Sequence, residues 1–179
     1  LAYRLVWELE RTEYITSYCC PPNLARMIAE SSEYAYTVSK DRIYTGIYGA
    51  NSAELQLQNG ERFTVEQRTS YPYDGKLIFD ITPAAENQGT PAYLMLRIPS
   101  WCEKGSLILS DGTCLSLSAE HQGTYIPVEI LPQGNTHAEL SLSMDARLTT
   151  AHAMVEEDIN QVAVERGPLV YCVESQDLP

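Results

Sequence analysis

The chain has 179 residues, of which 44% are apolar and 20% are charged, a composition that is ordinary for a globular protein. Its 24 acidic and 12 basic residues give a net charge of −12, which argues against nucleic acid or an anionic membrane as a partner, because both require basic patches. A neutral ligand such as a sugar fits this charge. No apolar run approaches the roughly 20 residues that span a bilayer, and Leu1 opens in the middle of what reads as a longer sequence, so we expect a piece of a larger protein.

A helix is predicted from about residue 22 to residue 33, after a segment of mixed character over residues 1–18. Leu24, Met27 and Ile28 recur at the spacing of one apolar helix face. The sequence Cys19-Cys20-Pro21-Pro22 places two cysteines at or just before the helix N-terminus, because proline is favoured at the first helical position. The positive end of the helix dipole favours thiolate over thiol there, and a thiolate is both a nucleophile and a metal ligand.

From about residue 35 the pattern changes to the two-residue period of β-strands. The predicted strands are 34–38, 42–48, 53–57, 62–68, 77–81, 92–99, 107–109, 115–117, 124–127, 138–143, 162–165 and 169–173. Asn59-Gly60 and Asp111-Gly112 supply hairpin turns. Short strands separated by turn signals predict a mainly β chain that forms an antiparallel, jelly-roll-like β-sandwich. The boundary between the helical piece and the β region falls near residues 35–41.

The adjacent cysteines have two readings. One is two buried structural thiols, and the other is one nucleophile and one metal ligand. Neighbouring cysteines rarely bond each other, because the small ring strains the disulfide, so a reactive or metal-bound pair is favoured over a structural disulfide. Two thiolates do not complete a tetrahedral zinc site, so the other ligands of a metal would come from residues outside the chain. The remaining cysteines, Cys102, Cys114 and Cys172, lie in strand-like contexts and are predicted to be small buried hydrophobes.

Other residues carry weaker signals. The histidines are scattered beside strands or loops and are predicted to be surface or packing residues rather than ligands: His121, His137 and His152. Trp101 is either a sugar-stacking platform or a residue that fills a core edge. The charge run Glu156-Glu157-Asp158 predicts a solvated loop.

Three sequence motifs together resemble glycoside hydrolase family 127, the β-L-arabinofuranosidase-like enzymes. The first combines Arg11-Thr12-Glu13-Tyr14-Ile15 with Cys19-Cys20-Pro21-Pro22-Asn23, which is similar to the cysteine motif of the family. The second, Leu96-Arg97-Ile98-Pro99-Ser100-Trp101, is similar to its RIPxW stretch. The third, residues 162–172, is similar to its VAxxRGPLVY strand. The three occur in the family's order over nearly the whole chain, and the cysteine motif is the most specific.

The resemblance implies a catalytic (α/α)6 barrel followed by β-sandwich domains, with residues 1–40 as the end of the barrel and residues 41–179 as the β-sandwich region. It implies that Cys19 is the nucleophile and contacts zinc, and that Cys20 is a zinc ligand. A glutamate and a third cysteine that complete the zinc site, and a glutamate that acts as general acid/base, would lie outside this chain. The implied reaction is retaining hydrolysis of an L-arabinofuranoside-type glycan, and the chain alone is expected to be inactive.

Two other functions remain open at this point. The first is a non-catalytic carbohydrate-binding or structural β-sandwich module, which has no use for two cysteines at a helix start. The second is a thiol-based zinc or redox module, which two cysteines support only weakly. The resemblance leaves the oligomeric state open, with dimer contacts through the C-terminal β-sandwich as one option. It leaves both a cytoplasmic and a periplasmic location in a bacterium open.

Overall fold

The computed structural model describes residues 18–172 and divides the chain into two compact units, residues 1–35 and 36–179. In the first unit, helix α1 (Cys20–Glu30) is followed by a 3-10 turn (Ser31–Tyr34). The predicted helix is confirmed, but it begins two residues earlier than expected and its last residues tighten into the 3-10 turn. The Ser31 hydroxyl donates a hydrogen bond to the Ile28 carbonyl at 2.8 Å, so this side chain satisfies a carbonyl at the end of the helix.

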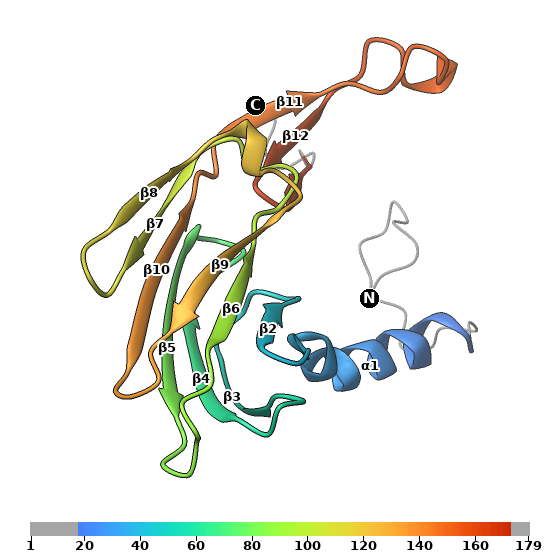
Figure 1. The fold of residues 1–179 in the computed structure, drawn as a ribbon. Coiled ribbons are helices and arrows are strands. Elements are labelled where there is room, and N and C mark those ends of the chain that lie inside the picture. Colours follow the sequence, from blue (N-terminus) through green and yellow to red (C-terminus); the bar gives the residue numbers. More distant parts are fainter. Residues whose placement is uncertain (1–17, 173–179) are drawn as a thin grey trace. The chain divides into compact units, whose positions relative to one another are not determined.

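The second unit is built from β-strands (Figure 1). Its strands are β1 (Tyr36–Val38), β2 (Arg42–Thr45), β3 (Asn51–Gln56), β4 (Arg62–Thr69), β5 (Lys76–Pro83), β6 (Ala92–Arg97), β7 (Gly105–Leu109), β8 (Cys114–Leu117), β9 (Tyr125–Ile130), β10 (Thr136–Leu142), β11 (Ala146–Thr149), β12 (Ala163–Arg166) and β13 (Leu169–Tyr171). They form a four-stranded sheet in the order β1-β2-β6-β9, a six-stranded sheet in the order β3-β4-β5-β10-β7-β8, and a three-stranded sheet, β11-β12-β13.

The predicted antiparallel β-sandwich is confirmed. Every strand pair of the six-stranded sheet is antiparallel. The four-stranded sheet adds one feature that the sequence did not predict, a parallel pairing of β2 with β6 that sets Ile43 opposite Leu94. Such a pairing needs a long crossover connection, and here the chain passes through β3, β4 and β5 before it returns to form β6.

The core lies between the two larger sheets and consists of alternate side chains from their strands. From the six-stranded sheet, β5 buries Leu77, Phe79 and Ile81, and from the four-stranded sheet, β6 buries Leu94 and Leu96. Burying a side chain of this size contributes about 1.5–3 kcal/mol relative to leaving it in water. The alternation of apolar and polar residues in the sequence therefore identifies which side chains of each sheet face the core.

The three cysteines of the β region do not behave alike. Cys102 is buried as predicted, its thiol donates to the Lys104 carbonyl at 3.1 Å, and burial raises the pKa of this thiol. The prediction of buried side chains is wrong for Cys114 and Cys172, which are both exposed. Cys114 begins the edge strand β8, on the opposite face from the buried Leu117, and Cys172 follows β13 at the edge of the three-stranded sheet.

Within residues 18–172, no helix is both long enough and apolar enough to cross a bilayer.

Candidate functional site

The two thiols of the cysteine motif lie together at the start of α1. Cys19 is the N-cap residue and Cys20 is the first residue of the helix, and prolines occupy the first turn. The Cys19 carbonyl accepts the first helical hydrogen bond from the Asn23 amide at 3.2 Å. The Cys19 Sγ and Cys20 Sγ atoms are 3.4 Å apart, a contact between two thiols, and Cys19 is exposed whereas Cys20 is partly buried. The predicted position of both cysteines at the helix N-terminus is confirmed.

The separation of the two sulfur atoms fits a shared metal ion. Two thiolates that each lie 2.3 Å from a tetrahedral zinc ion are about 3.8 Å apart, close to the 3.4 Å that separates the sulfurs of Cys19 and Cys20. Thiolate sulfur is a preferred zinc ligand, so the chemistry of this donor pair also fits. Among residues 18–172, no group of three or more His, Cys, Asp or Glu side chains is placed to hold a metal ion. A tetrahedral zinc site takes four ligands, so the two thiols alone would not complete one.

The Asn23 side chain of the same motif is held by the helix itself. Arg26, one turn further along α1, donates a hydrogen bond from its guanidinium group to the Asn23 side-chain oxygen. This contact fixes the side chain of Asn23 and brings a positive charge to the turn that carries the cysteines. The remaining part of the motif, residues 11–15, lies outside the described residues.

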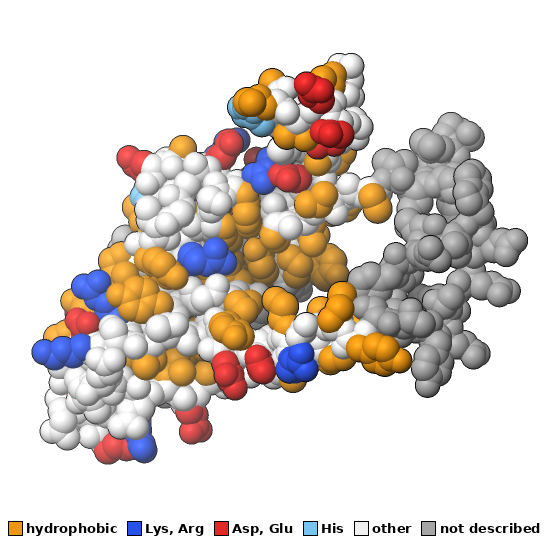
Figure 2. All heavy atoms as spheres, turned by 90° about the vertical axis from the view of Figure 1, so that its right-hand side faces the viewer, with side chains coloured by type: hydrophobic (Ala, Val, Ile, Leu, Met, Phe, Trp, Pro, Cys, Tyr) orange, Lys and Arg blue, Asp and Glu red, His pale blue; other side chains and the backbone are white. Residues whose placement is uncertain are grey.

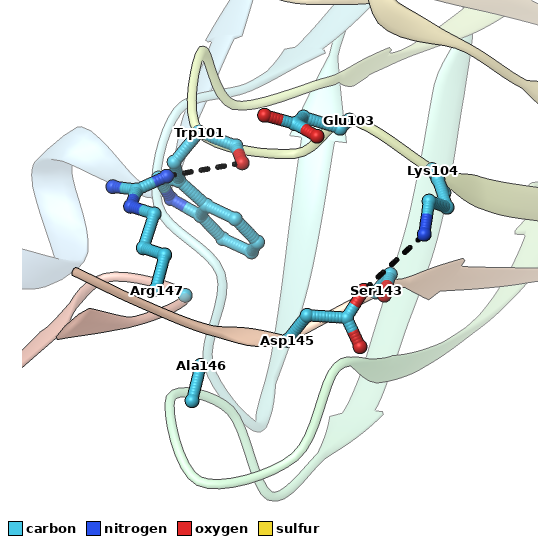
Figure 3. A pocket seen from close by; sticks show the side chains of 8 residues that line it. Trp101, Glu103, Lys104, Ser143, Asp145, Ala146 and Arg147 are labelled. Atoms are coloured by element: carbon cyan, nitrogen blue, oxygen red, sulfur yellow. Dashed lines mark hydrogen bonds and ion pairs between the residues drawn. The ribbon is translucent and has the colours of Figure 1, made fainter.

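A pocket of about 260 Å³ lies in the β region, next to Trp101. Its wall combines Trp101, Glu103 and Lys104 from the loop after β6 with Ser143 and Asp145, which precede β11, and with Ala146, Arg147 and Gly167. In Figure 3 the indole of Trp101 points into the space between that loop and the segment that carries Asp145, Ala146 and Arg147. Trp101 is partly buried and packs against the core, so it fills a core edge and lines a pocket at the same time.

Two ion pairs involve charged side chains of this pocket. Arg147 pairs with Glu165, with its Nε and Nη2 atoms at 2.7 and 2.6 Å from Glu165 Oε2, and its Nη1 donates to the Trp101 carbonyl at 3.3 Å. On the other side, Lys104 Nζ lies 3.7 Å from Asp145 Oδ2 (Figure 3). The pair between Arg147 and Glu165 holds the pKa of the Glu165 carboxyl below its usual range.

His152 is exposed, whereas His121 and His137 are partly buried, which agrees with the predicted surface or packing positions. Within the described part of the chain, none joins the cysteines in a group that could hold a metal. His121 Nδ1 accepts a hydrogen bond from the Ser118 amide at 3.1 Å, and His152 Nδ1 accepts one from the Met154 amide at 3.2 Å. The charge run Glu156-Glu157-Asp158 forms an exposed 3-10 turn, as expected for a solvated loop. Apolar and acidic side chains are exposed together there, at the top of Figure 2.

His137 belongs to a charged cluster that the sequence did not reveal. It lies opposite Asp80 across the pair β5–β10, and its Nδ1 donates to Asp80 Oδ1 at 2.8 Å. This hydrogen bond raises the pKa of His137. Partial burial raises the pKa of Asp80, but the hydrogen bond from His137 and the charge of Arg68 outweigh it and hold this pKa below its usual range. Residues on three strands meet here, and no local sequence pattern indicates such a cross-strand contact.

Two family models match this chain. Residues 42–144 match the middle domain of the GH127 beta-L-arabinofuranosidases, and residues 146–179 match the C-terminal domain of glycoside hydrolase family 127. The division between the two matches falls just before β11, where the three-stranded sheet begins.

Known proteins are similar over nearly the whole chain, but the chain spans only about a quarter of their length. A non-reducing end beta-L-arabinofuranosidase of Bifidobacterium longum subsp. longum is 33% identical over 172 residues, which cover 94% of this chain and 25% of that protein. A crystal structure of a GH127 beta-L-arabinofuranosidase from Geobacillus stearothermophilus T6 superposes with a TM-score of 0.81 at 28% identity, over 94% of this chain and 26% of the other. A further solved structure, described as a glycoside hydrolase, gives a TM-score of 0.83 at 39% identity, over 99% and 29% of the two chains.

Proposed function

Since this chain belongs to glycoside hydrolase family 127, we propose that it is part of a retaining β-L-arabinofuranosidase in which Cys19 is the nucleophile and Cys19 and Cys20 are zinc ligands. The observation that carries this proposal is the thiol pair at the start of α1, with sulfur atoms 3.4 Å apart and Cys19 exposed. The names of the similar proteins support the substrate class, because two of them are beta-L-arabinofuranosidases.

The proposed reaction has two displacement steps. Cys19 Sγ attacks the anomeric carbon, and the new carbon–sulfur bond forms as the glycosidic carbon–oxygen bond breaks. The leaving oxygen takes its proton from a glutamic acid that lies outside this chain. Water then gives a proton to the same carboxylate, forms a bond to the anomeric carbon and releases Cys19 as thiolate, so that two inversions retain the configuration.

The residues of this chain prepare the nucleophile. The helix N-terminus carries both thiols on consecutive residues, and the side-chain conformations bring the two sulfur atoms within 3.4 Å of each other. Cys20 is partly buried and would act as a ligand, whereas the exposed Cys19 can reach a sugar. When bound to the two thiols, zinc would keep them ionised near neutral pH.

The alternative, a carbohydrate-binding or structural β-sandwich module without chemistry of its own, leaves the thiol pair without a role. A substitution in the full-length enzyme separates the two functions. We expect Cys19→Ala to reduce the turnover of an aryl β-L-arabinofuranoside at least about 1,000-fold, because the nucleophile is lost. Cys114→Ala removes an exposed thiol outside the motif and serves as the matched control, with turnover unchanged.

The 179-residue chain is expected to show no turnover, because the general acid/base lies outside it. A Cys19→Ala enzyme that keeps its turnover would leave the hydrolase assignment intact and exclude Cys19 as the nucleophile. An adduct between the sugar and Cys19, detected by mass spectrometry after reaction with a slow substrate, would identify the attacking atom directly.

A further inference from the structure

The function proposed for the cysteine motif does not account for the pocket beside Trp101. Every residue that lines this pocket falls between positions 101 and 167, and none belongs to the cysteine motif. Its volume of about 260 Å³ lies just below the roughly 300–1,000 Å³ of pockets that enclose drug-sized ligands. A space of this size suits one sugar ring of a longer glycan better than it suits a large cofactor.

The pocket is lined by side chains that donate hydrogen bonds and by side chains that accept them. Lys104 and Arg147 carry positive charges, whereas Glu103 and Asp145 carry negative charges, and all four line the same space. The two carboxylates would repel an anionic ligand, and the ammonium and guanidinium groups would repel a cationic ligand. A hydroxyl group is both a donor and an acceptor, so a neutral polyol is the chemistry that can pair with both kinds of side chain.

Trp101 adds an apolar surface that is held in place before any ligand arrives. Its side chain packs against the core, and its carbonyl accepts a hydrogen bond from Arg147, whose guanidinium group is fixed by Glu165. A rigid aromatic side chain loses little conformational freedom on binding, which lowers the cost of forming a complex. The C–H faces of a sugar ring are apolar and match the face of an indole.

We infer that this pocket is a non-catalytic binding site for one ring of a neutral saccharide, with Trp101 as the apolar platform and Lys104, Glu103 and Asp145 as hydrogen-bonding partners. The site would hold a glycan on the β region independently of the chemistry proposed for Cys19. It goes beyond the proposed hydrolase function, because it binds sugar without cleaving it.

The experiment follows the fluorescence of Trp101 in the full 179-residue chain. The chain has two tryptophans, so Trp7→Phe leaves Trp101 as the single tryptophan, which is excited at a wavelength where the 12 tyrosines do not absorb. This variant is titrated with a neutral arabinan hexasaccharide, with an oligogalacturonide of the same length and with a chitosan hexamer. We expect a saturable change in emission with the neutral arabinan, and an affinity at least threefold lower for the two charged oligosaccharides.

Two lysine variants in the same background test the residues that line the pocket. Lys104→Ala removes an exposed donor from the pocket and is expected to weaken arabinan binding at least threefold, whereas the matched control Lys40→Ala removes an exposed lysine elsewhere and leaves it unchanged. Circular dichroism confirms that both variants keep the fold. The proposal is overturned if the arabinan causes no saturable change, if a charged oligosaccharide binds more tightly, or if Lys104→Ala binds as well as Lys40→Ala. Because the readout is binding without turnover, it is independent of the result for Cys19→Ala.

Discussion

Gly167 lies against the indole ring of Trp101, so that a β-carbon built at Gly167 is 3.4 Å from Trp101 Cη2. The same β-carbon would approach the terminal methyl group of Met144 to 2.5 Å, and the backbone of Gly167 has φ of +56°. The two residues come from two of the motifs that resemble family 127, and they join the sandwich to the three-stranded sheet. These two motifs therefore meet in space at one packing contact.

The first prediction concerns this contact. We expect Gly167→Ala to lower the free energy of unfolding by about 2–3 kcal/mol, because positive φ strains an alanine there and the new methyl group would displace Met144. Gly123→Ala is the matched control, since Gly123 also has positive φ but nothing lies within 4 Å of its added β-carbon, and it should cost about 1 kcal/mol. Urea denaturation measures both. Equal losses would show that crowding by Met144 adds nothing to the cost of placing a side chain at Gly167.

The second prediction concerns Gly75, where two chain segments approach too closely for any side chain. A β-carbon there would lie 2.0 Å from the Leu142 carbonyl oxygen, and the backbone cannot move away easily because the Leu142 amide donates to the Gly75 carbonyl at 2.9 Å. We expect Gly75→Ala to lower the free energy of unfolding by about 3 kcal/mol or more. Gly49→Ala, with nothing within 4 Å, is the control and should change the thermal midpoint little. A stable Gly75→Ala variant would contradict the predicted clash.

The third prediction concerns the buried carboxylate of Glu61, whose residue is only 3% exposed. Its Oε1 accepts hydrogen bonds from the amides of Gln88 and Thr90 at 3.1 and 3.0 Å and so fixes the loop between β5 and β6. Glu61→Ala leaves both amides without this acceptor, so it should lower the free energy of unfolding by about 1–3 kcal/mol. Glu61→Gln keeps an acceptor oxygen and should cost less. Hydrogen exchange at the two amides is the measurement, and unchanged protection in Glu61→Ala would refute the assignment.

The fourth prediction concerns pH and the pair formed by Asp80 and His137. The folded-state pKa of Asp80 is lowered, so its contribution to stability is present above the unfolded-state pKa and is lost as the pH falls. The folded-state pKa of His137 is raised, so its contribution is complete below its unfolded-state pKa and is lost as the pH rises through the raised value. With unfolded values near about 4 and 6.5, the pair should stabilise the fold most between them.

A double-mutant cycle with Asp80→Asn and His137→Gln measures this coupling. Urea midpoints at several pH values should give the largest coupling free energy near pH 5 and a smaller one at pH 8.5. A coupling that grows as the pH rises would contradict the proposed charge state of His137.

The fifth prediction concerns zinc. In the full-length enzyme, Cys20→Ala removes one of the proposed ligands and should lower the zinc content to less than half, as measured by elemental mass spectrometry. Cys114→Ala should keep the full content, because this exposed thiol lies in β8. A Cys20→Ala enzyme with an unchanged zinc content would rule out Cys20 as a ligand. This measurement does not depend on turnover.

The sequence predicted the sandwich because its long strands bury one face. In β4 and β5 every second residue is buried, so Phe63, Val65 and Phe79 reveal both the strands and their inward side. The strand β11 was not predicted, because all four of its residues are exposed and it therefore carries no burial pattern. The parallel pairing of β2 with β6 could not be predicted either, because the two strands lie far apart in the sequence and neither carries a signal for its partner.

The candidate sites divide in the same way. The thiol pair depends on consecutive residues and a helix start, so the sequence located it, while the proposed roles of Cys19 and Cys20 stay predictions. The assignment of residues 1–40 to the end of a helical barrel also stays a prediction. In the pocket, the sequence singled out only Trp101. Lys104 and Arg147 reach the same space because β7, β10 and β11 bring distant segments together, and that arrangement has no local signal.

The position of β10 has a consequence for how this protein is made. This strand lies between β5 and β7 in the six-stranded sheet, although it follows both of them in the sequence. While the chain is being synthesised, β3, β4 and β5 can pair with one another, and β7 can pair with β8, but the two halves stay separate until residues 136–142 leave the ribosome. A late strand that closes a sheet gives the fold a high contact order and slow folding. Until then β5 exposes an open edge, so a ribosome that stalls before residue 136 would release a chain prone to aggregate.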